Sequence, residues 1–136
     1  MMPLRSFLCM LFSLCLPTTL LAHIQVEHPI VFATQAGEPS AVFMDLHNHS
    51  QEPVQLAFVQ SKVKSRLALH GMQKGHMIDL PTILIPPHST VQLKRGGLHI
   101  MVFDLEQSLQ VGEQYPLSLF FDNGEVIEIK ANVVAP

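Results

Sequence analysis

The sequence predicts an all-β protein built as an antiparallel β-sandwich or barrel. Short runs of alternating apolar and polar residues recur about every ten residues, with Gly, Pro, Asn and Asp between them. None of these runs has the spacing of an amphipathic helix. The expected strands cover residues 24–33, 41–48, 54–61, 67–72, 77–80, 90–94, 99–105, 115–121 and 125–133.

Turn residues separate these strands in order along the chain. Residues 38–39, 51–53 and 86–89 each contain proline, which lacks a backbone N–H and is therefore kept out of the interior of a sheet. Gly71 and Gly75 predict a tight turn before the strand that begins at Met77. We therefore expect short connections between neighbouring strands.

Alternation also predicts which side chains face the core. Val54, Leu56 and Phe58 lie two residues apart and should share one face of their strand. Asn123-Gly124 separates the last two strands and predicts a type I′ hairpin turn, because both central residues of that turn need a positive φ. A second set of residues expected to share a face is Tyr115, Leu117, Leu119 and Phe121.

Residues 1–22 are expected to be a cleaved signal peptide. Arg5 supplies the positive charge at the start, residues 7–16 form an apolar run, and Ala22 ends an acceptable cleavage site. The apolar run is too short to span a membrane, which takes about 20 residues. We therefore expect residues 23–136 to form one exported domain without a membrane span after cleavage.

The composition excludes several classes of function. The net charge is −3 with histidine neutral, and no basic run occurs, so nucleic acid is not an expected partner. Cys9 and Cys15 both fall inside the expected signal peptide, which leaves the mature chain without a thiol. A blue-copper centre needs a cysteine thiolate, so an electron-transfer protein of that kind is not expected.

Methionine and histidine cluster in two segments of the chain. His70-Gly71-Met72 lies just before Met77, and His99-Ile100-Met101 follows after 21 intervening residues. Thioether sulfur together with imidazole nitrogen suits Cu(I) better than Zn, Mg or Ca. The competing interpretation is that these methionines only fill gaps in the core. Three of the four methionines after residue 22 lie in or beside the two segments, which favours a metal site.

These residues resemble the periplasmic copper chaperones of the PCuAC family. The pattern of that family is a His, ten residues, a Met, twenty-one residues and then His-x-Met, and Met77, His99 and Met101 match it in register. His70 departs from it, because six residues rather than ten separate it from Met77. Arg95 stands where the family tends to have a proline. The resemblance implies a cupredoxin-like Greek-key fold with the metal ligands gathered at one end.

The motif and the resemblance together predict a Cu(I) site. We expect His70, Met77, His99 and Met101 to be its ligands. Two His and two Met leave no open coordination position and no general base, so an enzyme is not expected. Such a protein would be a carrier of copper.

Further residues are weaker candidates for metal binding. The shortened loop before Met77 makes Met72 and His76 available in place of a ligand that no longer reaches. Cleavage after Ala22 would make His23 the mature N-terminus, where its amine and imidazole, with His28, could hold Cu(II) at a secondary N-terminal site. The alternative for His23 is a frayed terminus without metal.

The resemblance also implies a role and a partner. The family delivers copper in the periplasm, usually for assembly of the copper centre of cytochrome c oxidase. The expected partner is a copper-accepting protein, either an oxidase subunit or another copper chaperone. The alternatives left open by the sequence are an exported protein that sequesters copper and a β-sandwich interaction protein that binds no metal.

Overall fold

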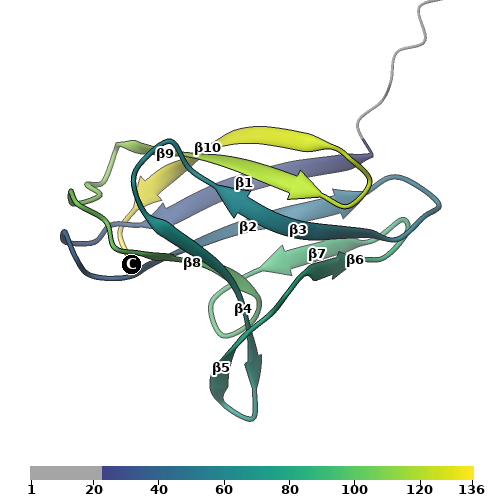
Figure 1. The fold of residues 1–136 in the computed structure, drawn as a ribbon, viewed down its shortest axis with the longest axis horizontal. Coiled ribbons are helices and arrows are strands. Elements are labelled where there is room, and N and C mark those ends of the chain that lie inside the picture. The colour runs from purple at the N-terminus through teal and green to yellow at the C-terminus, as the bar shows by residue number, and fades with distance from the viewer. Residues whose placement is uncertain (1–22) are drawn as a thin grey trace, which may run out of the picture.

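The computed structural model describes residues 23–136, so the expected signal peptide lies outside the described residues. Strands and their connections make up this part of the chain, which contains no helix that could cross a membrane. Figure 1 shows the strands in chain order. They are β1 (Ile24–Phe32), β2 (Ser40–Asn48), β3 (Val54–Gln60), β4 (Arg66–Gln73), β5 (His76–Asp79), β6 (Ile83–Ile85), β7 (Thr90–Leu93), β8 (His99–Phe103), β9 (Gln114–Phe121) and β10 (Val126–Val134).

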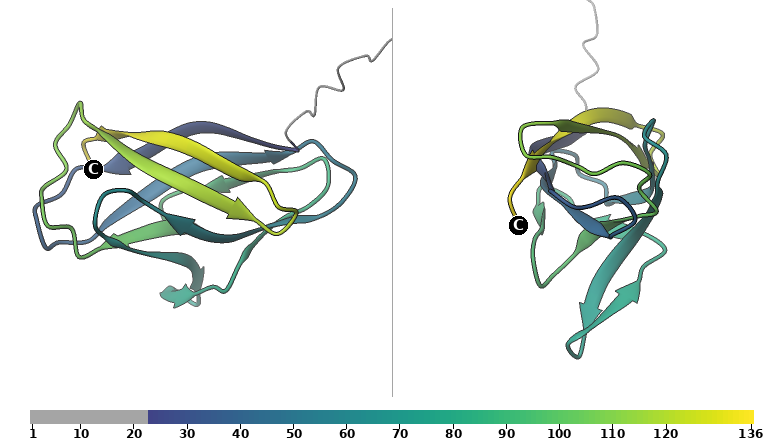
Figure 2. Two further views of the ribbon diagram at one scale, coloured as in Figure 1. Left: turned by 45° about the horizontal axis from the view of Figure 1, so that its top comes forward. Right: turned by 90° about the vertical axis from the view of Figure 1, so that its left-hand side faces the viewer.

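The strands form one sheet that rolls up on itself, as the two views of Figure 2 show. Their order is β5-β4-β8-β2-β1-β10-β9-β3-β6, and β7 pairs with β2 beside this path. Because β3 also approaches β4, the sheet encloses a core like a flattened barrel. The predicted all-β class is confirmed. The sheet is mostly antiparallel, and the exception is β1 with β10, which run parallel.

Every expected strand is present, with ends that shift by up to two residues. The strand β6 was not predicted from the sequence. It has three residues, lies between Pro81 and Pro86, and is too short to show an alternating pattern. Its pairing with β3, in which Val54 lies opposite Ile85, makes it a strand.

The core lies between the two walls of the rolled sheet. Ile100 and Val102 of β8 are completely buried within it, and the expected core residue Met44 of β2 is buried as well. The hydroxyl of the buried Tyr115 forms a hydrogen bond with Ser65, which satisfies its polar end. Because side chains alternate along a strand, His99 and Met101 of β8 lie on the face turned away from this core.

A bulge corrects the expected orientation of Phe58. Val54 and Leu56 are buried as predicted, but the pairing of β3 with β9 shifts register between Leu56 and Phe58. The extra residue turns Phe58 outward, where it is 48% exposed and stacks on Phe120 with ring centroids 4.3 Å apart. The four alternating residues of β9 from Tyr115 to Phe121 are all buried, as expected.

The hairpin between β9 and β10 is present, but its turn is not type I′. Gly124 has a φ of 90°, whereas Asn123 is not among the described residues with a positive φ. The Gly124 amide donates to the Phe121 carbonyl oxygen at 3.1 Å, and the Phe121 amide donates to the Glu125 carbonyl oxygen at 3.0 Å. The loop is therefore longer than the two-residue loop of a type I′ hairpin, and it ends with Gly124 in the left-handed conformation.

The type I′ pattern occurs instead between β4 and β5. Lys74 and Gly75 have φ values of 51° and 79°, and they form the two-residue loop of this hairpin. The sequence predicted a turn built around Gly71 and Gly75. Gly75 is in the turn, but Gly71 lies within β4 opposite Ile78, so that part of the prediction was wrong. In Figure 1 the hairpin projects from the body of the sandwich.

Candidate metal centre

Strand pairing brings the two segments rich in His and Met together. His70 of β4 lies directly opposite His99 of β8, and Met72 of β4 lies opposite Met77 of β5. Met101 is two residues from His99 and therefore shares its face. Because paired residues on adjacent strands point to the same side of a sheet, all five side chains lie on one face.

This face is the outer side of the sheet, where the β4–β5 hairpin leaves the sandwich. The pairing of β4 with β8 brings the residues together. A depression of about 160 Å³ opens on this face. Its lining consists of Phe32, Ala41, Phe43, Met72, Met77, Arg95, Gly96, His99 and Met101.

Burial divides these side chains into two groups. His70, His99 and Met101 are 9%, 4% and 9% exposed, whereas Met72 and Met77 are 38% and 58% exposed. Aromatic rings help to enclose the buried group, since Phe43 packs against His99 and Phe103 packs against His70. The site is therefore closed around the imidazoles and open at the thioethers of the hairpin.

Each of the two imidazoles has one nitrogen held by a hydrogen bond. His70 Nε2 lies 2.7 Å from Asp79 Oδ1, and His99 Nδ1 lies 2.8 Å from the Gly97 carbonyl oxygen. Carboxylate and carbonyl oxygens only accept, so a neutral imidazole donates from these nitrogens and has a lone pair on the other. The second nitrogens, His70 Nδ1 and His99 Nε2, are buried, and neither has a hydrogen-bond partner within residues 23–136.

Two buried nitrogen lone pairs on neighbouring imidazole rings can serve a metal ion. Buried polar atoms in folded proteins are nearly always hydrogen-bonded, so a pair of exceptions on one face indicates a missing partner. The His70 and His99 ring centroids are 5.5 Å apart and the rings are inclined at 77°. With a metal–nitrogen distance of about 2.0 Å, one ion between the rings could contact a nitrogen of each.

Asp79 and Gly97 were not among the site residues predicted from the sequence. A histidine that ligates a metal usually donates its other ring N–H to a carboxylate or a backbone carbonyl, and these two groups occupy those places. The signal for Asp79 was its spacing, because it is two residues from Met77 and thus on the same face of β5. No comparable signal exists for the carbonyl group of Gly97.

His76 and His23 are not brought to this site. His76 is exposed and pairs with Gln73, so alternation places it on the opposite side of the hairpin from Met77. His23 precedes β1, whose Ile24 pairs with Asn48 at the far end of β2. The other end of β2 carries Ala41, which pairs with Met101 at the site. Most of the length of β2 therefore separates His23 from the cluster.

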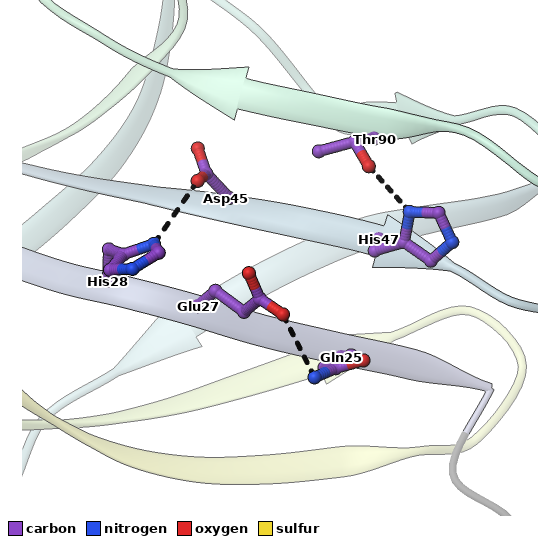
Figure 3. A network of polar contacts seen from close by, with 6 residues as sticks. All are labelled: Gln25, Glu27, His28, Asp45, His47 and Thr90. Carbon is purple, nitrogen blue, oxygen red and sulfur yellow. Dashed lines mark hydrogen bonds and ion pairs between the residues drawn. The ribbon is translucent and has the colours of Figure 1, made fainter.

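His28 belongs to a different group, shown in Figure 3. It lies in a bulge of β1 with a φ of 53°, and its Nδ1 is 3.5 Å from Asp45 Oδ2. Glu27, His28 and Asp45 each offer a ligand atom, and these atoms lie within 4.8 Å of one another. The sequence paired His28 with His23, whereas the structure places it beside these two carboxylates.

The fold is that of a PCuAC domain. Solved structures of high similarity include the copper-bound PCuAC domain from PmoF2, which is 28% identical with a TM-score of 0.74 and covers 85% of this chain and 95% of that one. The apo PCuAC domain from PmoF1 is 26% identical with a TM-score of 0.75, covering 85% and 96%. Cu(I)-bound DR1885 from Deinococcus radiodurans is 26% identical with a TM-score of 0.62, covering 79% and 77%.

The chain belongs to the LpqE-like family, whose profile matches residues 24–133. A curated relative is the uncharacterized protein RP573 of Rickettsia prowazekii, which is 27% identical over 99 residues. That match takes in 67% of this chain, and this chain spans 54% of the length of that protein.

Proposed function

We propose that this protein is a copper chaperone that binds one Cu(I) and transfers it to a recipient. The proposed ligands are His70, Met77, His99 and Met101. The observation that carries the proposal is the pair of buried imidazole nitrogens that have no hydrogen-bond partner among residues 23–136, on the same side of the sheet as the thioethers. The copper-bound state of the PmoF2 domain and the Cu(I)-bound state of DR1885 support it.

The chemistry of these donors favours monovalent copper. Thioether sulfur is soft and uncharged, and two neutral imidazoles complete a donor set that suits Cu(I). None of the described residues is a cysteine, so the site holds no thiolate that would retain copper by charge or form a disulfide in an oxidising compartment. A donor set of two imidazoles and two thioethers leaves no open coordination position, which supports a carrier function.

The open side of the site suits transfer of the metal. Met77 is the most exposed of the five candidate side chains, and Met72 lies directly opposite it. Copper held by buried imidazoles, the buried Met101 and the exposed Met77 can exchange the Met77 sulfur first for a ligand of the recipient. Met72 can then replace Met77 as a copper ligand, either in the stable complex or while the copper is leaving.

The compartment and the recipient belong to the same proposal. We place the mature protein in the periplasm after removal of residues 1–22, and its recipient is a copper-accepting protein that serves assembly of the cytochrome c oxidase copper centre. Another copper chaperone is the alternative recipient. A protein that sequesters surplus copper would use the same site without transfer, and a β-sandwich interaction protein would bind no copper there.

A secondary Cu(II) site near the N-terminus is also part of the proposal. Cu(II) prefers nitrogen and oxygen donors, and Glu27, His28 and Asp45 provide both kinds. His23 with its free amine, created by cleavage after Ala22, is the other candidate.

Competition for Cu(I) against a chromophoric chelator tests the main site. The parent protein should bind one Cu(I), and a Met77→Ala/His99→Ala/Met101→Ala variant should not. A His88→Ala variant is the matched control, because His88 lies in an exposed turn. The loaded protein should then supply copper to an apo copper domain of an oxidase subunit. Binding without transfer would favour sequestration, and equal binding by parent and triple variant would exclude the proposed ligands.

A further inference from the structure

We propose that Asp79 is a positioning residue that selects which nitrogen of His70 binds copper. This inference rests on the proposed function and concerns a residue outside its ligand set. Asp79 holds the Nε2–H of His70 and thereby presents Nδ1 to the metal. His99 is assigned the opposite arrangement, with Nδ1–H held and Nε2 presented.

The register of the β4–β5 hairpin places the two groups together. His70 and Asp79 are directly opposite each other, and Nε2 lies 2.7 Å from Oδ1, which is a hydrogen-bonding distance for a charged acceptor. The His70 side chain is 11% exposed and that of Asp79 is 89% exposed. The carboxylate therefore keeps most of its hydration while one oxygen reaches the buried ring.

The hydrogen bond determines the tautomer of a neutral His70. A carboxylate has no proton to donate, so Nε2 must carry the hydrogen and Nδ1 must carry the lone pair. Nδ1 is the atom that is buried without a partner in the described part of the chain. Without Asp79 the ring could hold its proton on either nitrogen, and a proton on Nδ1 would block the metal.

The second histidine depends on a different kind of support. His99 Nδ1 bonds to the backbone carbonyl oxygen of Gly97, which no side-chain substitution removes. The His70 tautomer instead depends on one side chain. The two histidines can therefore be tested separately, because a substitution of Asp79 should change the tautomer of His70 and leave the tautomer of His99 unchanged.

The experiment uses the protein produced from its full-length sequence and exported, with Asp79→Ala and Asp79→Asn variants. An Asn side chain retains an oxygen acceptor, so Asp79→Asn tests the hydrogen bond separately from the charge. The control is Glu106→Ala, which removes an exposed carboxylate that pairs with Lys64 at 2.8 Å and lies outside the site. The two readouts are the imidazole tautomer from long-range 15N NMR at about pH 8, where a free imidazole is neutral, and the Kd for Cu(I).

We expect His70 in the parent protein and in Asp79→Asn to carry its proton on Nε2. In Asp79→Ala the tautomers should mix, and the Kd for Cu(I) should rise about 10- to 100-fold, as is usual when the partner of a ligating histidine is lost. Asp79→Asn should restore most of that affinity, and Glu106→Ala should match the parent in both measurements. The His99 tautomer should stay the same in every variant.

The outcomes separate this inference from the proposed function. If the parent binds Cu(I) and Asp79→Ala has the same tautomer and the same Kd, Asp79 has no positioning role, although the copper site stands. A tautomer change without a change in Kd would show that His70 is not a ligand, and would also overturn the inference. A parent protein that binds no Cu(I) would overturn the proposed function and this inference with it.

Discussion

His70 and His99 face each other across neighbouring strands, with ring centroids 5.5 Å apart. Their positions are set by backbone pairing between β4 and β8, so the two rings are held at a nearly constant separation. A site whose nitrogens are fixed in this way needs little rearrangement to accept an ion. The exposed thioethers of the hairpin can then adjust around it.

Loss of one of these imidazoles should nearly abolish copper binding. We expect His99→Ala to raise the Kd for Cu(I) by more than about 100-fold, since loss of an outer-shell partner alone costs 10–100-fold. Chelator competition measures the Kd, and circular dichroism checks that the variant is folded. His88→Ala is the control. A folded His99→Ala protein with the affinity of the parent would remove His99 from the ligand set.

The two methionines of the hairpin should partly substitute for each other. Met77→Leu removes the sulfur and keeps the volume, and we expect it to weaken Cu(I) binding about 10-fold because Met72 lies opposite and can supply a thioether. The double variant Met72→Leu/Met77→Leu should bind Cu(I) clearly more weakly than Met77→Leu alone. X-ray absorption can count the sulfur ligands in each. Equal affinity of parent and double variant would show that neither exposed thioether binds.

The turn between these methionines should limit the stability of the hairpin. Gly75 has a φ of 79°, so Gly75→Ala should destabilise the protein by about 1 kcal/mol. Lys74 also has a left-handed φ of 51°, and Lys74→Asn should stabilise by about 0.5 kcal/mol because asparagine tolerates it better. Thermal unfolding measures both changes.

Gly97→Ala is the control for the turn, since a Cβ there meets its nearest atoms at 3.6 Å and the φ is not left-handed. It should unfold close to the parent temperature. Gly75→Ala with an unchanged Tm would contradict the assigned turn.

Asn48 should be important for stability and unimportant for copper. It is completely buried, and its Nδ2 donates to the carbonyl oxygens of Glu52 and Ile85 at 2.8 and 3.0 Å. Its Oδ1 accepts from the Ser50 amide at 2.9 Å. Asn48→Ala leaves these groups without partners and should lower the free energy of unfolding by about 2–3 kcal/mol.

Urea unfolding measures that loss, and Asn123→Ala in the exposed hairpin loop is the control. Below its unfolding transition, Asn48→Ala should bind Cu(I) like the parent. A large loss of copper affinity in the folded variant would show that the core around Asn48 supports the site.

Electron paramagnetic resonance can locate the secondary Cu(II) site. On protein that begins at His23, we expect His28→Ala to remove the Cu(II) signal of bound metal and His23→Gln to preserve it, since His28 lies beside two carboxylates. A signal with nitrogen couplings that vanishes only in His23→Gln would place the metal at the N-terminus. Absence of bound Cu(II) in the parent would remove the secondary site altogether.

Local patterns accounted for most of the strands and for the choice of candidate ligands. Alternation located β9 and its buried face correctly because a period of two is visible within one strand. It failed at Phe58, since a bulge depends on how β3 pairs with β9, and it missed β6, which has too few residues to alternate. The Asn-Gly pair predicted a hairpin, but the loop length determined its turn type.

The sequence by itself determined the kinds of donor this protein can offer, because the spacing of Met77, His99 and Met101 is a property of the chain. Only the tertiary structure decided that His70 lies opposite His99, that Asp79 and Gly97 hold their rings, and that His76 lies on the other side of the hairpin. The physical reason is that strand register is a non-local property. It depends on the packing of the buried face, and a shift of one residue would move every side chain of β4 to the opposite side.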